Sequence, residues 1–293
     1  QESIQMYHKF IKQKNKKTNQ VVKNIELNVK TEVLFEGFNK NIYKKTNEVL
    51  DLPEIKEQFC FLFVGHWMQG AFGHDRKNVG LLVKSFLETF KNKQKQPALI
   101  MKTSGGVISY MDRDAILKKI NDIKKTVKGK LPKIYVVHGD LLDEEMNELY
   151  NHPKVKCMVN ITKGEGFGRP LLEFTQTKKP GTLGDIHKSV KNDWFVDGAK
   201  WFDVDQMALG KALKDMHKNY KNYTHKAKQQ GNFAKENFTY TKMKEKFSKI
   251  LEENVKAAPQ QVPLQLPKLK KVGENKPTEL PKLKLPKLKK VEI

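Results

Sequence analysis

Four short apolar runs, separated by segments with helical periodicity, constrain the fold of this chain more than any other feature of its sequence. The runs cover residues 59–64, 98–101, 134–137 and 155–161, the last of which is interrupted by Lys156 and Asn160. Continuously apolar strands are typical of a parallel sheet that is covered on both faces. Between the runs, apolar residues recur at helical spacing, as in Val79, Leu82, Val83, Phe86 and Phe90. This order predicts an α/β fold with a doubly wound parallel sheet, whose ligands bind beyond the carboxyl ends of the strands.

The last apolar run leads into a glycine-rich loop and the start of another helix, within residues 163–180. Gly164, Gly166 and Gly168 allow the backbone to take positive φ and to approach a ligand closely. Pro170 suits the first helical position, where its missing N–H costs nothing. Free backbone amides at such a helix start attract an anion or a hydroxyl-rich group. The loop is therefore the first candidate for a binding site.

Two carboxylates flank this loop, and together with its glycines and proline they form a motif. The segment Glu165-Gly-Phe-Gly-Arg-Pro-Leu-Leu-Glu173 resembles the E-x7-E signature of the group 1 (family 4) glycosyltransferases, which are retaining enzymes of the GT-B fold. The alternative is a strand-to-helix turn whose glycines serve only a steric purpose. The resemblance implies that the sheet is the Rossmann-like, donor-binding C-terminal half of such an enzyme.

The resemblance also implies roles for individual residues, with a nucleotide sugar as the ligand. Glu165 would accept hydrogen bonds from the hydroxyls of the donor sugar, and Glu173 would bind the ribose diol. Backbone amides around Gly166, Phe167 and Gly168 would hold the same sugar. From their spacing we expect the two acids to line one cleft without contacting each other.

A basic turn after the first apolar run is the second site element. Arg76 and Lys77 enter a helix after a flexible loop, which suits a diphosphate whose negative charge grows as the glycosidic bond breaks. By resemblance the pair matches the family's R-K-G, with Lys77 stabilising the departing diphosphate and His66, after Gly65, in the other basic position. His138 ends the third run, where the family's backbone holds the nucleobase. The alternatives are a solvated basic loop for the pair and a plain turn former for His138.

Composition and resemblance together divide the chain into domains. Residues 1–35, with a predicted helix over 3–16 and a strand over 25–35, resemble a remnant of, or lead-in from, a preceding domain, because they are too few for the acceptor-binding domain of a complete GT-B enzyme. Residues 36–256 are predicted to form the nucleotide-sugar-binding domain. After the helix of the motif the family continues with a short apolar strand, and Gly181-Thr-Leu-Gly indicates that this strand is shortened or missing here.

Residues 257–293 differ in composition from the rest of the chain and predict a disordered, basic tail. The segment LPKLKKV occurs at 266–272 and again at 285–291, and the tail has nine lysines against three glutamates. Proline every few residues prevents a regular helix, and the apolar residues are too dispersed for a core. The tail is either a solubilising extension or an arm for an anionic polymer or a membrane surface, in keeping with a formal net charge of +23 for the chain.

Other features of the sequence exclude several classes of protein and site. No apolar run is long enough to span a bilayer, and Cys60 and Cys157 lie in apolar runs, as buried thiols in the reducing cytoplasm would. Asp112-Arg-Asp114 has the D-x-D pattern of metal-dependent transferases, but it precedes a helical pattern, which favours N-capping. We expect no metal site, because metal-ligand spacing is lacking at the histidines considered, namely His66, His74, His138 and His187. We also expect no cofactor, since the nucleotide sugar implied by the resemblance is a substrate.

The predicted function is that of a retaining glycosyltransferase of hexosyltransferase type, which moves a sugar from a UDP- or GDP-sugar to an acceptor hydroxyl. The acceptor is left open among a glycan, a lipid, a protein and modified DNA. The charge and the tail leave open an enzyme that glycosylates modified DNA bases, whose DNA binding should fall steeply with salt. The third hypothesis is a non-catalytic module that binds nucleotide sugars.

Overall fold

The structure is a computed structural model of the chain. It describes side chains for residues 32–68, 75–165, 167–179 and 204–255, and the backbone alone for 11–14, 21–25 and 181–183. Within these ranges no helix has the length and apolar character needed to cross a membrane. The tail predicted over residues 257–293 and the predicted site residue Gly166 lie outside the described residues.

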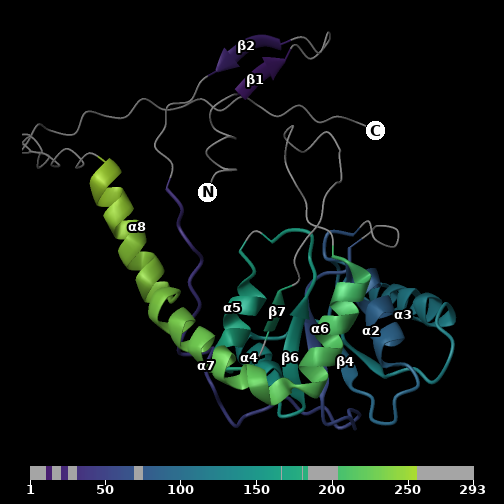
Figure 1. Cartoon of the computed structure of the whole chain (residues 1–293). Coiled ribbons are helices and arrows are strands. Elements are labelled where there is room, and N and C mark those ends of the chain that lie inside the picture. The colour runs from purple at the N-terminus through teal and green to yellow at the C-terminus, as the bar shows by residue number, and fades with distance from the viewer. Residues whose placement is uncertain are drawn as a thin grey trace, which may run out of the picture. The chain divides into compact units, whose positions relative to one another are not determined.

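Among the described residues, five parallel strands form a central sheet in the spatial order β5-β4-β3-β6-β7 (Figure 1). Their bounds are β3 Cys60–Val64, β4 Ala98–Lys102, β5 Ile134–Val137, β6 Val155–Asn160 and β7 Gly181–Leu183. Every neighbouring pair is parallel, with Leu62 of β3 opposite both Ile100 of β4 and Met158 of β6. The predicted α/β fold with a doubly wound parallel sheet is confirmed.

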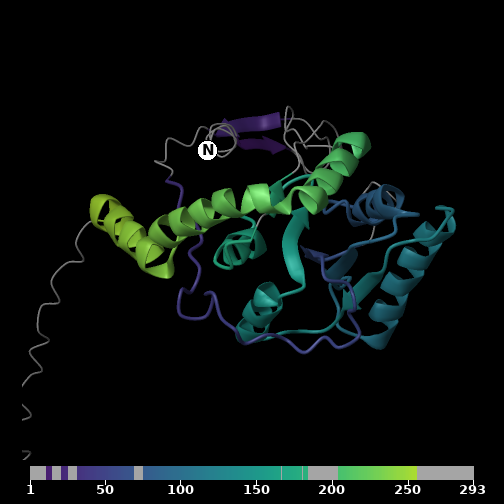
Figure 2. The same ribbon diagram turned by 60° about the horizontal axis from the view of Figure 1, so that its bottom comes forward.

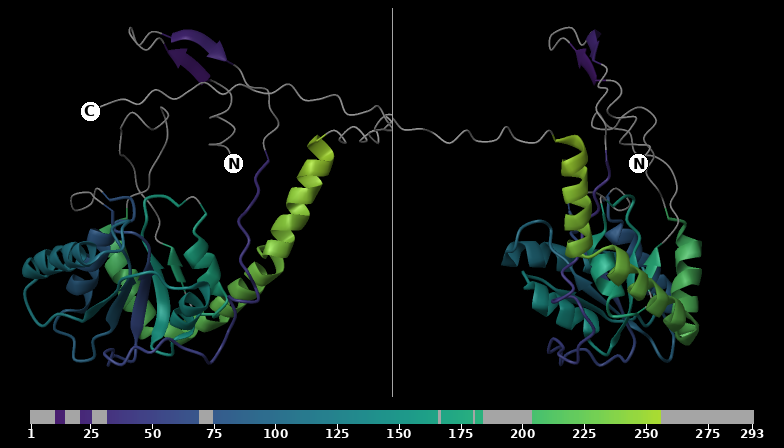
Figure 3. Two further views of the ribbon diagram at one scale, coloured as in Figure 1. Left: turned by 180° about the vertical axis from the view of Figure 1, so that it is seen from behind. Right: turned by 90° about the vertical axis from the view of Figure 1, so that its left-hand side faces the viewer.

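Helices pack on both faces of this sheet. The bounds of the helices are α2 Val79–Phe90, α3 Tyr110–Lys125, α4 Asp143–Asn151, α5 Arg169–Thr175, α6 Gln206–Lys218, α7 Tyr220–Asn237 and α8 Tyr240–Asn254. Helix α8 buries none of its residues and does not belong to these layers. Successive side chains of a strand point to opposite faces. Phe61 and Phe63 of β3 therefore join a core with α2, α3 and α6, whereas Cys60 and Leu62 join a second core with α4 and α5. Figure 3 shows this arrangement from behind and from the side.

The order of the strands reverses at one place in the sheet. From β3 the chain runs through α2 to β4 and through α3 to β5, outward along one half of the sheet. It then returns through α4 to β6, on the other side of β3. In open sheets of this kind, ligands bind outside the carboxyl ends of the strands at which the order reverses. Residues just after Val64 and Asn160 are therefore best placed to form a site.

The C-terminal helices lead the chain back to the segment that precedes the sheet. Helix α6 packs beside α2, and α7 runs on to α5 (Figure 2). Between α7 and α8, Phe38 forms a backbone bridge to Thr239. A Cβ at Gly37 would lie 2.5 Å from the carbonyl atoms of Thr239. Glycine at position 37 thus permits two segments that are far apart in the sequence to approach closely.

The prediction for the N-terminal segment is wrong where the structure describes it. Ile11–Lys14 form strand β1, antiparallel to β2 at Val21–Ile25, in place of the helix predicted over 3–16. Cross-strand hydrogen bonds override the local helical pattern here. Residues 32–35 are not in a strand. By contrast, the strand after α5 is shortened rather than missing, because β7 pairs with β6 over three residues.

Candidate functional site

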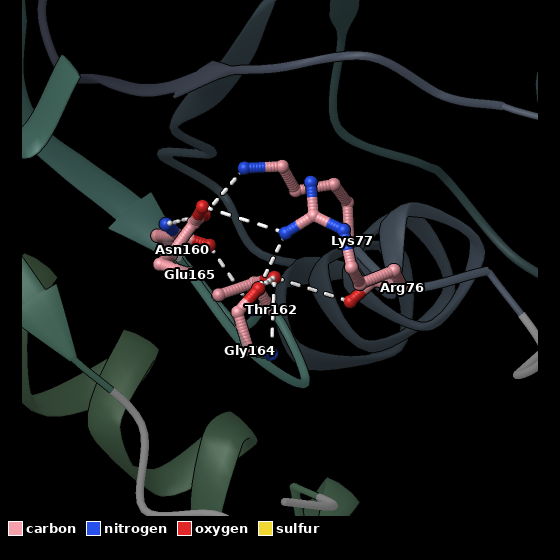
Figure 4. A network of polar contacts seen from close by, with 6 residues as sticks. All are labelled: Arg76, Lys77, Asn160, Thr162, Gly164 and Glu165. Atoms are coloured by element: carbon pink, nitrogen blue, oxygen red, sulfur yellow. Dashed lines mark hydrogen bonds and ion pairs between the residues drawn. The ribbon is translucent and has the colours of Figure 1, made fainter. Parts of the chain in front are cut away.

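The candidate site is built on the end of β6 and the loop that follows it. Asn160 is the last residue of β6, and its side-chain amide donates a hydrogen bond to Glu165 Oε1 at 2.9 Å. Its Oδ1 accepts a bond from the Thr162 N–H at 3.0 Å, and the Thr162 hydroxyl lies 2.9 Å from Gly164 O. These bonds fold the loop back on the strand and hold the Glu165 carboxylate near its carboxyl end (Figure 4).

The turn before α2 is joined to this loop through the backbone of Arg76. The Lys163 N–H donates to the Arg76 carbonyl oxygen at 2.7 Å, and the Thr162 hydroxyl lies 3.1 Å from the same oxygen. Asp75 Oδ1 accepts from the Val79 N–H at 3.0 Å and so satisfies a free amide at the start of α2. The basic turn and the glycine-rich loop are therefore one hydrogen-bonded unit.

Opposite charges meet in this unit. Lys77 Nζ forms an ion pair with Glu165 Oε1, and the Arg76 guanidinium lies 3.5 Å from Glu165 Oε2 and donates to the Gly164 carbonyl. The side chains of Lys77 and Glu165 are 15% and 19% exposed, and that of Arg76 is 48% exposed. The structure thus brings together the three residues that the sequence singled out as catalytic, and their side chains converge in Figure 4.

The surroundings of Glu165 keep its carboxylate ionised. Burial alone would raise the pKa of this carboxyl, but hydrogen bonds from Lys77 and Asn160 and the charges of Lys77 and Arg76 outweigh burial. The pKa of Glu165 is therefore lowered from its ordinary value. Two cations facing one carboxylate leave an excess of positive charge, which suits an anionic ligand.

Gly65 and His66 follow β3 beside the basic turn. A Cβ at Gly65 would lie 3.5 Å from the Lys77 Cε, an ordinary van der Waals distance, so position 65 lies directly beside the lysine stem. His66 Nδ1 lies 2.9 Å from Ser104 Oγ, which follows β4. The imidazole is thereby held towards the end of β4, whereas Arg76 and Lys77 face the end of β6.

His138 is placed apart from the ion pair, at the end of β5. Its Nε2 lies 2.8 Å from Asp112 Oδ2, and the same Asp112 oxygen accepts from the Gly105 N–H at 2.8 Å. Burial, which raises the pKa of Asp112, is outweighed by these two partners, so its pKa is lowered. The N-capping predicted for Asp112-Arg-Asp114 is wrong, because Ser109 caps α3 by accepting from the Asp112 N–H.

The second acid of the motif has a different environment from the first. Glu173 is only 5% exposed. Its Oε2 accepts from the Tyr150 hydroxyl at 3.2 Å, and its Oε1 lies 3.1 Å from the Arg169 guanidinium. Burial raises the pKa of Glu173, against the opposing effects of Arg169 and Tyr150. The carboxylate is thus engaged within the protein, and its role towards a ribose stays a prediction.

A cavity of about 620 Å³ lies between α5 and α7. Three residues of the glycine-rich loop, Glu165, Phe167 and Gly168, are among those that line it. Gly168, which precedes α5, has a φ of 80°. The positive φ predicted for this glycine is therefore confirmed. Arg169 is the first residue of α5 and Pro170 the second. Of the two acids expected to line one cleft, Glu165 lines this cavity and Glu173 is not among its lining residues.

Several residues of the site were not found from the sequence. Asn160 and Thr162 fix the position of Glu165, and Arg169 and Tyr150 engage Glu173. A signal existed for Asn160, because a polar residue that directly follows the apolar residues 157–159 and ends the strand lies at the ligand-binding edge of the sheet. No group of three or more His, Cys, Asp or Glu residues is arranged to hold a metal ion in the part of the chain that the structure describes.

The sequence matches no family model and no curated protein. Among solved structures, Anabaena HepE in complex with UDP-glucose is similar with a TM-score of 0.52 and 13% identity, over 76% of this chain and 57% of HepE. The C-terminal domain of a glycosyl transferase group 1 family protein, LpcC from Francisella tularensis, has a TM-score of 0.49 and 13% identity, over 70% of this chain and 100% of the domain. Such low identities show the fold alone, and this chain spans little more than half the length of HepE. The fold of the chain is similar to that of GT-B glycosyltransferases, as the E-x7-E motif predicted.

Proposed function

We propose that this chain is the donor-binding half of a retaining glycosyltransferase, of hexosyltransferase type, that takes its sugar from a nucleotide sugar. The observation that carries the proposal is the meeting of Arg76, Lys77 and Glu165 between the carboxyl ends of β3 and β6. Cations and a carboxylate are needed side by side for a ligand that joins a diphosphate to a polyhydroxyl group. The UDP-glucose bound by HepE, whose fold is similar, is a ligand of this kind.

Each group has a defined task in the proposed reaction. Lys77 and Arg76 face the diphosphate and stabilise the negative charge that develops on it as the glycosidic bond breaks. Glu165, ionised because of its lowered pKa, accepts hydrogen bonds from the sugar hydroxyls and orients the anomeric carbon. Retention follows from attack of the acceptor on the face that the diphosphate leaves, with the leaving phosphate as the base. The separation rules for paired glycosidase carboxylates do not apply to such a reaction.

Three measurements on the full chain test the proposal in sequence. Calorimetric titration with UDP, GDP and their hexose conjugates should show saturable binding of one nucleotide family. Hydrolysis of the preferred donor then separates a catalyst from a binding module. Transfer to a panel of glycan, lipid, protein and DNA acceptors with free hydroxyls defines the substrate. The proposal is wrong if neither UDP- nor GDP-sugars bind.

A further inference from the structure

The two cations assigned to the diphosphate already have an anion within the protein. Glu165 contacts Lys77 through Oε1 and approaches Arg76 through Oε2. Lys77 and Glu165 are both largely withdrawn from solvent, so their attraction is screened less than that of a surface pair. A phosphate group that binds Lys77 and Arg76 must therefore compete with this carboxylate.

We propose that Glu165 is an internal counter-anion that selects for ligands carrying both a multiply charged phosphate group and hydroxyls in one molecule. The inference rests on the proposed function, and it assigns Glu165 a role in specificity besides its contact with the sugar. A ligand with a single negative charge only replaces one anion by another of equal charge. A diphosphate brings two or more negative charges to the same two cations, and so gains over the carboxylate that it displaces.

The displaced carboxylate stays close to the ligand because Asn160 holds it. The Asn160 amide donates to Glu165 Oε1 at 2.9 Å, and Asn160 is itself fixed through the bond from the Thr162 N–H at 3.0 Å. This bond does not involve Lys77 or Arg76, so it persists when a phosphate takes the cations. Asn160 is thus a positioning residue.

Once its cations are taken, the carboxylate keeps the Asn160 bond alone and needs further hydrogen-bond donors, because an incompletely paired ionised group is costly. Hydroxyls of a sugar attached to the diphosphate supply them. A bare diphosphate cannot, and it therefore leaves Glu165 less well satisfied. The ion pair thereby links recognition of the phosphates to recognition of the sugar.

Glu165→Gln tests the inference, because it removes the charge and keeps the shape. Its affinity for inorganic pyrophosphate, measured by calorimetry on the full chain, should rise about fivefold, since the competitor is gone. The additional affinity of a nucleotide sugar over its bare nucleotide should fall in the same variant. Glu88→Gln is the matched control, because Glu88 pairs with Lys91 at the far end of α2 and should change neither affinity.

The outcomes separate this inference from the proposed function. A purely structural role for Glu165 predicts that both affinities fall together, and unchanged or weaker pyrophosphate binding by Glu165→Gln overturns the inference. Should that variant not fold, Glu165→Asp replaces it, because the shorter side chain draws the carboxylate away from Lys77 and Arg76 and so weakens the competitor. Pyrophosphate binding by Glu165→Asp that is no tighter than that of the wild type would equally contradict the inference. If the wild type binds no nucleotide sugar but Glu165→Gln binds pyrophosphate more tightly than the wild type, Glu165 competes with phosphate as proposed, but the proposed function is wrong.

Discussion

The two acids of the glycine-rich motif are eight positions apart in the sequence, but they lie in opposite environments. Glu165 lies in the loop after β6, contacts Lys77 and Arg76 and has a lowered pKa. Glu173 lies on the buried side of α5, engaged by Tyr150 and Arg169, and has a raised pKa. Of the two acids, Glu165 lines the cavity between α5 and α7, and Glu173 is not among the residues that line it.

This difference shows that two identical side chains take different roles according to their positions in the fold. A loop at the carboxyl end of a parallel strand projects its groups towards a ligand, whereas a helix face turned towards the sheet uses its groups for packing. We therefore assign ligand recognition first to Glu165 and its cations. Glu173 first of all holds the start of α5 against α4, through Arg169 and Tyr150.

The largest expected effect is the loss of nucleotide binding when the cation beside Glu165 is removed. Lys77→Met should weaken binding of the preferred nucleoside diphosphate about 100-fold, because a largely buried cation would otherwise pair with the phosphates. Calorimetry measures this loss, and Lys91→Met, at the other end of α2, is the matched control. A loss below about threefold would place the diphosphate elsewhere and remove the contrast between the two acids.

The next effect concerns stability and belongs to Glu173. Glu173→Ala should lower the free energy of unfolding by about 2 kcal/mol, because the buried Tyr150 hydroxyl loses its acceptor and Arg169 its partner. Glu173→Gln, which still accepts from Tyr150, should cost less than about 1 kcal/mol. Urea titrations compare the two variants. Equal stability of Glu173→Ala and the wild type would show that the carboxylate has no structural role.

A smaller effect distinguishes the two acids by pH. The folded pKa of Glu165 is lowered, so its ionisation stabilises the fold above its unfolded pKa of about 4.3, and this contribution is lost as the pH falls through the folded value. The folded pKa of Glu173 is raised, so its contribution is present in acid and is lost as the pH rises through the folded value. Two differences in the free energy of unfolding are compared as functions of pH: wild type minus Glu165→Gln, and wild type minus Glu173→Gln. The first should rise with pH and the second should fall. Parallel slopes would contradict the assignment of the two environments.

The smallest expected effect on nucleotide binding is that of replacing His138, which the sequence predicted to belong to the site. His138 Nε2 lies 2.8 Å from Asp112 Oδ2. The imidazole therefore already has a partner within the protein, as the Glu173 carboxylate does. His138→Ala should leave the nucleotide dissociation constant within about twofold, while costing about 1 kcal/mol of stability. A tenfold loss of nucleotide affinity in a folded variant would instead give the imidazole a direct contact with the base.

Sequence reasoning found the sheet from its apolar runs and singled out Arg76, Lys77 and Glu165 from their motifs, but it did not predict that Lys77 and Glu165 form an ion pair. The apolar runs marked the strands, and the reversal of strand order then brought Lys77 and Glu165 together across 88 positions. Strand β7 was harder to find, since Gly181-Thr-Leu183 is stabilised by backbone pairing with β6 rather than by an apolar pattern.

The contacts of the other site residues could not be predicted, because they depend on how loops pack in space. The bond of His138 to Asp112 joins the end of β5 to the start of α3. The burial of Glu173 depends on Tyr150, which comes from α4. Neither pairing has a sequence spacing of its own, whereas helical or strand periodicity has one.

The most direct test of the account is a crystal structure of the full chain with its preferred UDP- or GDP-sugar. We predict that the diphosphate lies between the ends of β3 and β6, on Lys77 and Arg76, and that Glu165 has exchanged these cations for hydroxyls of the sugar. A donor bound away from these strand ends, or an intact pair between Lys77 and Glu165 beside a bound donor, would contradict it.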